Sequence, residues 1–397
     1  MDDQRIPGAP RESLRIALVT ETYPPEVNGV ALTLARLVDG LRGRGHDVQV
    51  VRPRQGRLDR ARQAPELSET LTAGLPIPGY PGLRLGLPCR RTLQRLWAAN
   101  PPDIVHVATE GPLGMAAVAA ASALGLPVSS GFHTNFHAYS SHYRLGWLRG
   151  VVTRHLRRFH NRTGLTLAPT EEVARQLTND GYRNVTVLSR GVDTDLFNPR
   201  RRSPALRLSW SADERALVVA YVGRLAPEKN LSLVTATFDA ISARHRDARL
   251  VFVGGGPLFD SLNKQPHPRW VFAGIRHGED LATHYASADL FLFPSLTETF
   301  GNVVPEALAS GLAVVAFDCA AAGDLIDDGV NGRVVGVGDG RAFRDAALTL
   351  ADNRKAMTTL RARSSISVSH LGWDRIHDRF AKLLVELATD NHARRRA

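Results

Sequence analysis

Short apolar runs alternate with stretches of helical periodicity along most of this chain. The clearest run is Leu290–Phe293, which reads LFLF and contains no polar residue. A strand of this kind must be covered on both faces, as parallel strands are in α/β proteins. The alternation of such strands with helices indicates repeated strand–helix–strand units. The sequence therefore predicts an α/β fold with doubly wound parallel sheets.

The pattern separates into two halves, which suits a chain of 397 residues, because that length is too great for one ordinary core. The first half predicts strands at Arg15–Thr20, Asp47–Val51, Asp103–Val107, Val128–Gly131, Leu165–Ala168 and Val185–Leu188, and helices at Ala31–Arg42, Gly114–Leu124 and Glu171–Asp180. The second half predicts strands at Ala216–Val222, Arg249–Val253, Trp270–Phe272, Asp289–Phe293 and Ala313–Phe317, and helices at Leu231–Arg244, Gly278–Ser287, Val303–Ser310 and Trp373–Ala388.

A polar, basic stretch, Asn198–Arg215, reads as the linker between the halves. We expect one domain over residues 1–200 and a second over residues 201–372. Residues 373–397 form a last helix that returns toward the first domain and ends in a basic tail.

Composition excludes several classes of protein. Hydrophobic residues make up 43% and charged residues 22% of the chain, which is typical of a globular protein. No apolar run approaches the ~20 residues that a membrane helix needs, and the N-terminus lacks the features of a signal peptide. Cys89 and Cys319 alone provide neither a disulfide framework nor a metal cluster. We expect a cytoplasmic protein.

A net charge of +11 points to an anionic partner. Residues 111–170 contain no Asp or Glu, and Leu148, Val152, Leu156 and Phe159 form a helical stripe there. Arginines flank the stripe, which is one signature of contact with an anionic membrane surface. A helix docked on the protein with a solvated basic face fits the same pattern, so both interpretations stay open. The arginines are Arg144, Arg149, Arg154, Arg157, Arg158 and Arg162.

Two glutamates flank the turn that follows Leu290–Phe293. Residues 298–311 read ETFGNVVPEALASG, so Glu298 lies in the loop and Glu306 lies in the next helix. Open α/β sheets bind ligands at the carboxyl ends of their strands. Ionised carboxylates accept strong hydrogen bonds from hydroxyl groups. This acidic turn therefore predicts a sugar-binding edge.

Arg224 and Lys229 follow the strand Ala216–Val222 within the text GRLAPEKN. Two cations near the start of a helix suit a diphosphate group and can neutralise the charge of a departing nucleoside diphosphate without a metal ion. An exposed basic loop is the simpler interpretation. The shared strand-end position with Glu298 favours a binding site.

Three further residues occupy comparable positions. Gly29 precedes a helix and permits close approach of a phosphate or sugar. His133 follows the strand Val128–Gly131, where a histidine can orient a hydroxyl group, and Arg190 follows Val185–Leu188. His137 and His142 lie near His133, but no carboxylate or cysteine completes a metal site. The dinucleotide fingerprint GxGxxG is absent, which disfavours a nicotinamide or flavin enzyme.

Six segments together resemble the family 4 retaining glycosyltransferases of the GT-B fold. They are TETYPPEVNGV, GFHTNF, SRGVDTDLFNP, VGRLAPEKN, VGGGP and ETFGNVVPEALASG, and they span roughly residues 15–328 in family order. The resemblance implies two Rossmann-like domains that face each other across a cleft. GFHTNF and NGV look most like the GDP-mannose-dependent α-mannosyltransferases, with UDP-sugar-dependent glucosyl or sulfoquinovosyl lipid transferases as the alternative subgroup.

The resemblance also implies a reaction: transfer of a hexosyl group, expected to be mannosyl, to a lipid or glycan acceptor with retention of configuration. It implies no metal or other cofactor besides the nucleotide-sugar donor. The membrane interpretation of the arginine-flanked stripe would place the protein at the inner face of the cell membrane. The implied donor-site roles are diphosphate binding for Arg224, Lys229 and Gly29, sugar binding for Glu298, ribose binding for Glu306, base contact for Arg276, a position beside the donor sugar for His133, and backbone N–H donation by Phe300, Gly301, Asn302 and Val303.

Two residues depart from the family pattern. The family often has a glycine pair where this chain has Asn28 and Gly29, which makes close backbone approach there less certain. Pro305 precedes Glu306, and a proline inside a helix removes a hydrogen bond and bends the chain. The position of Glu306 therefore depends on where the helix begins.

Two other functions are compatible with parts of the sequence. A GT-B relative that phosphorolyses or epimerises sugars is the first, but a pyridoxal-dependent phosphorylase needs a Schiff-base lysine, and Lys264, Lys355 and Lys382 have no supporting context. A nucleic-acid-binding protein is the second. Its positive charge fits, but no recognised motif accompanies the charge, so we expect no nucleic-acid partner.

Overall fold

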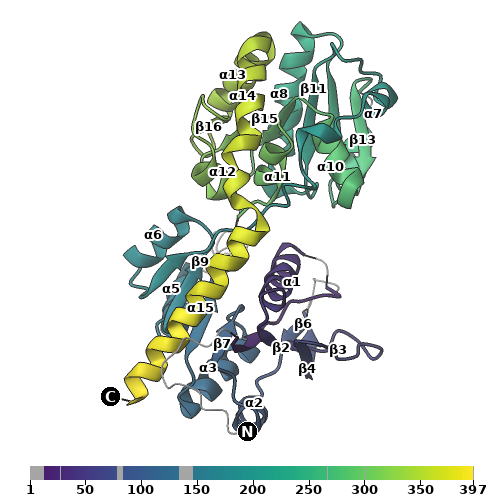
Figure 1. Ribbon diagram of the computed structural model, residues 1–397. Coiled ribbons are helices and arrows are strands. Elements are labelled where there is room, and N and C mark those ends of the chain that lie inside the picture. Colours follow the sequence, from purple (N-terminus) through teal and green to yellow (C-terminus); the bar gives the residue numbers. More distant parts are fainter. Residues whose placement is uncertain are drawn as a thin grey trace. The chain divides into compact units, whose positions relative to one another are not determined.

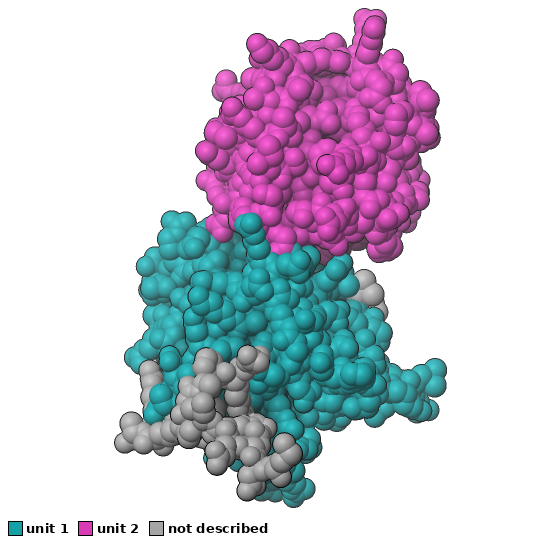
Figure 2. Space-filling view, viewed as in Figure 1, with its two compact units in different colours: residues 1–189, 373–397 teal, residues 190–372 magenta. Residues whose placement is uncertain are grey.

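The computed structural model describes residues 13–26, 28–77, 84–133, 146–265, 267–298 and 300–396. The chain divides into two compact units, coloured separately in Figure 2. Unit 1 contains Met1–Ser189 and Trp373–Ala397, and unit 2 contains Arg190–Gly372. The boundary that we expected after residue 200 therefore falls inside unit 2. The C-terminal helix is part of unit 1.

Unit 1 contains an eight-stranded sheet in which every pairing is parallel except that of its last two strands. A separate two-stranded antiparallel ribbon follows β4 (Leu67–Thr72) along the chain. It consists of β5 (Gly74–Pro76) and β6 (Arg84–Gly86). The order across the sheet is β10 (Val185–Val187), β9 (Leu165–Ala168), β8 (Val128–Gly131), β7 (Ile104–Val107), β1 (Arg15–Val19), β2 (Asp47–Pro53), β4 (Leu67–Thr72) and β3 (Gln63–Ala64).

The last helix of the chain packs against the first one (Figure 1). Phe380 and Leu384 are buried in one apolar cluster with Leu34 and Val38. Gly40 makes this contact possible, because a Cβ atom at that position would lie 2.1 Å from the His377 ring. The helices of unit 1 are α1 (Gly29–Arg42), α2 (Arg90–Ala99), α3 (Pro112–Leu124), α5 (Gly146–His160), α6 (Glu171–Asn179) and α15 (Trp373–Arg396).

Unit 2 contains a six-stranded sheet in which all neighbouring strands are parallel. The order across it is β13 (Trp270–Gly274), β12 (Arg249–Val253), β11 (Val218–Val222), β14 (Leu290–Phe293), β15 (Ala313–Phe317) and β16 (Arg333–Val335). Its α-helices are α7 (Pro204–Ser209), α8 (Leu231–Arg244), α9 (Phe259–Asn263), α10 (Gly278–Ala286), α11 (Val303–Ala309), α12 (Ala320–Leu325), α13 (Gly340–Asp352) and α14 (Arg354–Ser367), and its 3-10 helices are η1 (Pro199–Arg201), η2 (Pro227–Lys229) and η3 (Ser369–Leu371).

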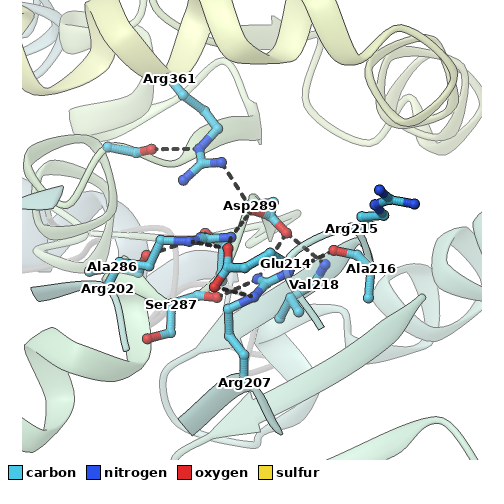
Figure 3. A network of polar contacts seen from close by, with 12 residues as sticks. Arg202, Arg207, Glu214, Arg215, Ala216, Val218, Ala286, Ser287, Asp289 and Arg361 are labelled. Carbon is cyan, nitrogen blue, oxygen red and sulfur yellow. Dashed lines mark hydrogen bonds and ion pairs between the residues drawn. The ribbon is translucent and has the colours of Figure 1, made fainter. Parts of the chain in front are cut away.

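The stretch that we interpreted as a linker is instead packed into unit 2. It contains η1 and α7, and the Arg207 side chain on α7 is buried. Asp289, just before β14, accepts hydrogen bonds from Arg207 at 3.1 Å, from Arg361 at 2.9 Å and from the Val218 backbone N–H at 2.9 Å (Figure 3). Arg202 adds an ion pair at 3.1 Å. We call this group the Asp289 network; it fastens α7 and α14 to the amino end of β14.

Candidate active site

The candidate site of unit 2 lies where the strand order of its sheet reverses. β11 pairs with β14, although the chain passes through β12 and β13 between them. In open α/β sheets such a switch point opens at the carboxyl ends of the strands and binds ligands there. The loop with Arg224 and Lys229 follows β11, and the loop with Glu298 follows β14. The structure thus brings the two predicted segments to one edge.

Lys229 and Glu298 form an ion pair at this edge. Both side chains are largely buried, with exposed fractions of 15% and 14%. Lys229 is the last residue of η2, and its Nζ atom lies 5.6 Å from the centre of the Phe293 ring at the end of β14. The Leu296 backbone N–H donates to the Glu228 carbonyl at 3.2 Å, which ties the two loops together. The cation and the carboxylate are therefore held beside each other.

Arg224 extends into solvent next to this pair. Its side chain is 64% exposed and forms an ion pair with Glu228. A hydrogen bond fixes its backbone position: the buried Tyr221 hydroxyl on β11 donates to the Arg224 carbonyl at 3.0 Å. A guanidinium that is exposed but anchored at its backbone is free to engage an anionic ligand.

Two glycines after β12 let a second loop lie directly on the Arg224 loop. A Cβ atom at Gly254 would come within 2.0 Å of the Gly223 carbonyl oxygen, and one at Gly256 within 2.5 Å of the Leu225 carbonyl oxygen. Both glycines also have positive φ angles, +137° and +154°, that L side chains rarely adopt. The glycine triplet is therefore not part of a dinucleotide-binding fingerprint. It allows the loop after β12 to pack closely against the backbone of the Arg224 loop.

The acidic turn leads into α11 through three residues. Phe300 is buried, Gly301 has a φ of +86°, and Asn302 precedes the first helical residue, Val303. Pro305 is the third residue of α11, so it lies in the first turn, where its missing N–H removes no helical hydrogen bond. The Glu306 backbone N–H donates to the Asn302 carbonyl at 3.2 Å. The proline thus leaves Glu306 in a regular helical position.

Glu306 is held by a tyrosine that sequence reasoning missed. The Tyr285 hydroxyl on α10 donates to Glu306 Oε2 at 2.9 Å. Part of the residue remains exposed, but protein atoms crowd the carboxyl group, and this desolvation raises the pKa of Glu306 to about 7. The hydrogen bond from Tyr285 acts in the opposite direction. Glu306 therefore titrates near neutral pH.

Arg190, the first residue of unit 2, also reaches the acidic turn. Its Nη1 atom donates to Asn302 Oδ1 at 3.3 Å, and its guanidinium lies 5.6 Å from the centre of the Phe300 ring. The residue is only 7% exposed. Burial lowers the pKa of Arg190 to about 10, an effect that the charge of Glu298 partly opposes. Arg190 is thus in contact with two predicted donor-site residues, Asn302 and Phe300.

Arg276 makes only local contacts among those that the described residues show. Its Nε atom donates to the Ala273 carbonyl at 2.7 Å, and its guanidinium pairs with Asp280 at 3.0 Å. Neither partner belongs to the acidic turn. The predicted contact of Arg276 with a nucleotide base stays a prediction.

Comparison with known proteins assigns the chain to a family. A sequence model described as Glycosyltransferase Family 4 matches residues 27–196, and one described as Glycosyl transferases group 1 matches residues 216–353. The chain is 34% identical to a GDP-mannose-dependent alpha-mannosyltransferase of Corynebacterium glutamicum, over 84% of this chain and 79% of the relative. The chain belongs to glycosyltransferase family 4. The resemblance inferred from the six segments is confirmed.

Two further comparisons concern the range of activities named among the relatives and the fold of the chain. This glycosyltransferase is 33% identical to a sulfoquinovosyl transferase of Arabidopsis thaliana, over 80% of this chain and 62% of the relative. Its structure superimposes on sucrose-phosphate synthase from Thermosynechococcus elongatus with a TM-score of 0.77 at 17% identity, covering 94% of this chain and 99% of the other. The predicted GT-B fold, with two Rossmann-like parallel-sheet units, is confirmed.

Unit 1 of the glycosyltransferase holds the two remaining predicted residues. Gly29 is the first residue of α1, and the Asn28 side chain caps that helix by accepting hydrogen bonds from the backbone N–H groups of Val30 at 3.0 Å and Ala31 at 2.8 Å. Asn28 in turn donates to Thr22 at 2.7 Å. The departure from the family's glycine pair thus has a physical result: a side chain occupies the N–H groups that would otherwise face a ligand.

His133 follows β8, and its ring lies over the strand end. A Cβ atom at Gly131 would be 2.7 Å from His133 Nε2 and 3.6 Å from His106 Nε2, so only glycine fits there. Burial lowers the pKa of His106 to about 4, which keeps that ring neutral. The rest of the GFHTNF segment, together with His137 and His142, lies outside the described residues.

Sequence reasoning missed two carboxylates at the carboxyl edge of unit 1. Glu21 follows β1 and accepts a hydrogen bond from the Leu113 N–H in the first turn of α3 at 2.9 Å; burial raises its pKa to about 7. Glu110 follows β7 and lies 3.3 Å from Nε2 of the buried His160. Glu21 lies two residues after a buried strand and Glu110 lies three residues after one, and this position is the signal that could have revealed them. Within the described part of the chain, no group of three or more His, Cys, Asp or Glu residues is arranged to hold a metal ion.

Proposed function

We propose that this glycosyltransferase moves a mannosyl group from GDP-mannose to a hydroxyl group of a lipid or glycan acceptor, with retention of configuration. Relatives at 34% identity are named GDP-mannose-dependent alpha-mannosyltransferases. The observation that carries the proposal is the Lys229–Glu298 pair beside Arg224 at the switch point of unit 2. A cation for phosphate and a carboxylate for sugar hydroxyls are adjacent there, as a nucleotide sugar requires.

Arg224 and Lys229 bind the diphosphate in this proposal. Negative charge builds on that group as the bond to the sugar breaks, and fixed cations stabilise it, so the reaction needs no metal ion or other cofactor. Glu298 accepts hydrogen bonds from donor-sugar hydroxyls, and its ion pair with Lys229 holds the carboxylate in place. The acceptor attacks from the side that the diphosphate leaves, through an oxocarbenium-like state, and the departing phosphate takes the acceptor proton.

Glu306 binds the ribose hydroxyls of the donor. Tyr285 engages Oε2, which leaves Oε1 as the acceptor for a ribose hydroxyl. Because the pKa of Glu306 is about 7, hydroxyl donors from the ligand favour its ionised form at neutral pH. The backbone N–H groups of residues 300–303 complete the contact of unit 2 with the donor.

Two substitutions test the site. Glu298→Ala and Lys229→Ala each abolish turnover, measured as release of nucleoside diphosphate from the donor in the presence of a membrane lipid extract. Glu279→Ala is the matched control, because Glu279 also pairs with a cation, Arg201 at 3.2 Å, but is 79% exposed on α10. Full turnover by both site variants would show that the site assignment is wrong.

The donor is tested by thermal stabilisation. A cognate nucleotide sugar binds only the folded protein and therefore raises the unfolding midpoint. We expect GDP-mannose to give the largest rise in a panel that includes UDP-glucose and UDP-sulfoquinovose. A larger rise with a UDP-sugar would replace the mannosyl assignment with the alternative, a glucosyl or sulfoquinovosyl lipid transferase, since such enzymes are also among the relatives.

We also propose that α5 contacts an anionic membrane surface from the cytoplasm. Val151 and Val152 are 60% and 45% exposed, and Arg154 and Arg158 are exposed on the same helix. Leu156 and Phe159, which we placed on the apolar stripe, are buried against the protein, so the two valines provide the apolar part of the contact. Arg144 and the side chains of residues 146–149 lie outside the description. No described helix has the length and apolar character to span a bilayer.

Sedimentation with anionic liposomes tests this contact. Three of the flanking arginines, Arg154, Arg157 and Arg158, have described side chains on α5. Arg157 donates to the Asp180 carbonyl at 2.8 Å and is therefore left intact. Arg154→Ser with Arg158→Ser reduces the bound fraction. The control is Arg375→Ser with Arg379→Ser, which removes the same charge from exposed positions on α15. Equal binding by both double variants would exclude α5 as the contact.

A further inference from the structure

Arg190 is a buried cation whose hydrogen-bonding capacity is mostly unused. Its Nη1 atom donates to Asn302, but its Nε and Nη2 atoms are buried and have no hydrogen-bond partner among the described residues. A guanidinium has five N–H donors, and a buried charge is normally both paired and hydrogen-bonded. The side chain is more than nine-tenths buried. The contacts of the protein itself thus leave this cation incompletely satisfied.

The surrounding charges do not compensate Arg190 either. Lys229 is paired with Glu298, and Arg224 is paired with Glu228. The hydrogen-bond partner of Arg190 is a neutral amide, and the nearest carboxylate acting on it, Glu298, already binds Lys229. These five side chains therefore carry three positive and two negative charges. As long as Glu306 is protonated, the site therefore has one positive charge in excess.

The unused atoms also have the right arrangement for an oxyanion. Nε–H and Nη2–H lie on the same edge of a guanidinium and point in parallel, which is the edge that binds phosphate or carboxylate through two hydrogen bonds. Nη1, on the other edge, is held by Asn302, and the flat face lies over Phe300. The acidic turn thus fixes the orientation of the guanidinium, while the described residues provide no hydrogen-bond partner for its Nε–H and Nη2–H edge.

We propose that Arg190 binds a phosphate oxygen of the nucleotide-sugar donor through Nε–H and Nη2–H, as a third cation of the donor site beside Arg224 and Lys229. The proposal rests on the proposed function and names a ligand for a residue to which the resemblance assigned no role. Arg190 would also couple donor binding to the position of the acidic turn, because Asn302 and Phe300 contact the same guanidinium. Its pKa of about 10 keeps it charged at neutral pH.

Arg190→Met tests the proposal by separating a ligand role from a structural one. Methionine keeps much of the side-chain volume and removes the charge. Because the charge is uncompensated in the free protein, we expect the unfolding midpoint without nucleotide to stay equal to that of the parent or to rise. The Kd for GDP rises by about 10- to 100-fold, the usual consequence of losing charge-assisted hydrogen bonds to a ligand.

Two companion variants and a second ligand sharpen the result. Arg190→Lys keeps the charge without the two-pronged edge, so its Kd for GDP falls between those of the parent and Arg190→Met. Asn302→Ala removes the hydrogen bond that positions Arg190 but keeps the guanidinium itself. It therefore weakens GDP binding less than Arg190→Met does. Inorganic pyrophosphate, which lacks the nucleoside, loses affinity in Arg190→Met by a similar factor.

The outcomes that contradict each proposal are distinct. If GDP and UDP both fail to stabilise the parent, the proposed function is wrong. If GDP binds the parent and binds Arg190→Met equally well, Arg190 is not a phosphate ligand. A midpoint several degrees lower for Arg190→Met in the absence of nucleotide, with unchanged GDP affinity, would show a structural role instead.

Discussion

The two ends of the unit 2 sheet use the same kinds of residue for different purposes. At the amino end, both carboxylate oxygens of Asp289 are engaged, by Arg207, Arg361, Arg202 and a backbone N–H (Figure 3). At the carboxyl end, Arg190 is similarly buried, but the described residues give it one hydrogen bond, to the neutral amide of Asn302. Burial of a charge is thus common to both ends. The two ends differ in how fully the buried charge is hydrogen-bonded: Asp289 has partners for both oxygens, whereas Arg190 has buried donors without a partner among the described residues.

The largest effect is expected from Asp289→Asn. This change leaves three arginines around a neutral amide, and breaking a buried ion-pair network by removing one partner costs about 3–5 kcal/mol. We expect the free energy of unfolding to fall by that amount in urea titration, while the Kd for GDP stays within about twofold. A loss below about 1 kcal/mol would mean that the amino end is not held together by its charges.

Glu306→Gln is expected to change the pH dependence of stability. The folded-state pKa of about 7 lies above the ordinary value of 4.5, so the fold favours the protonated form. The stability of the parent therefore falls as pH rises from about 4.5 to about 7, by up to about 3 kcal/mol relative to the glutamine variant, and changes no further above that range. Urea titrations of both proteins between pH 5 and pH 8 measure the difference. Parallel curves would contradict the raised pKa.

Glu228→Gln makes the same acid-to-amide change as Asp289→Asn, but at the open end of the sheet. Its partner Arg224 is 64% exposed, and solvent-exposed ion pairs contribute about 0.2–1 kcal/mol. We expect a loss of unfolding free energy in that range, which shrinks further in 0.5 M salt because exposed charges are screened. A loss as large as that of Asp289→Asn would remove the distinction between the two ends.

Arg276→Ala is expected to have the smallest effect. It breaks the Arg276–Asp280 pair at the start of α10, whose side chains are 40% and 52% exposed, and an exposed pair four residues apart contributes about 0.2–0.5 kcal/mol. Urea titration checks this value, and calorimetric titration with GDP and UDP checks the predicted contact with the base. An unchanged Kd for both nucleotides would exclude Arg276 from the donor site.

The sequence predicted most of the sheets because their strands are short, apolar and buried. Arg249–Val253 and Ala313–Phe317 have the predicted bounds. Elements with few buried residues were not predicted. Among them, α2 buries only Leu93 and Trp97, and β16 has three half-buried residues. The basic character of residues 198–215 suggested a linker, because a sequence does not show that a carboxylate 82 positions away will receive Arg207.

The candidate site could be predicted where chemistry follows directly from position along a strand. Lys229 and Glu298 were predicted to share one edge because both follow the carboxyl end of a strand. In the structure those strands are neighbours, and the two side chains are in contact. Tyr285 was missed, since the partner of a buried hydroxyl depends on packing between helices. Asn28 was noted as a departure from the family, but its capping role depends on backbone geometry that a single sequence does not display.

The return of α15 to unit 1 also sets an order for biosynthesis. Residues 190–372 leave the ribosome before Ile376, Phe380 and Leu384, so the second sheet can be complete while one side of α1 still faces water. Until residues 373–397 have left the ribosome, Leu34 and Val38 remain exposed as an apolar surface that other nascent chains and chaperones can bind. A premature stop codon near position 372 would thus yield a finished second half attached to an aggregation-prone first half.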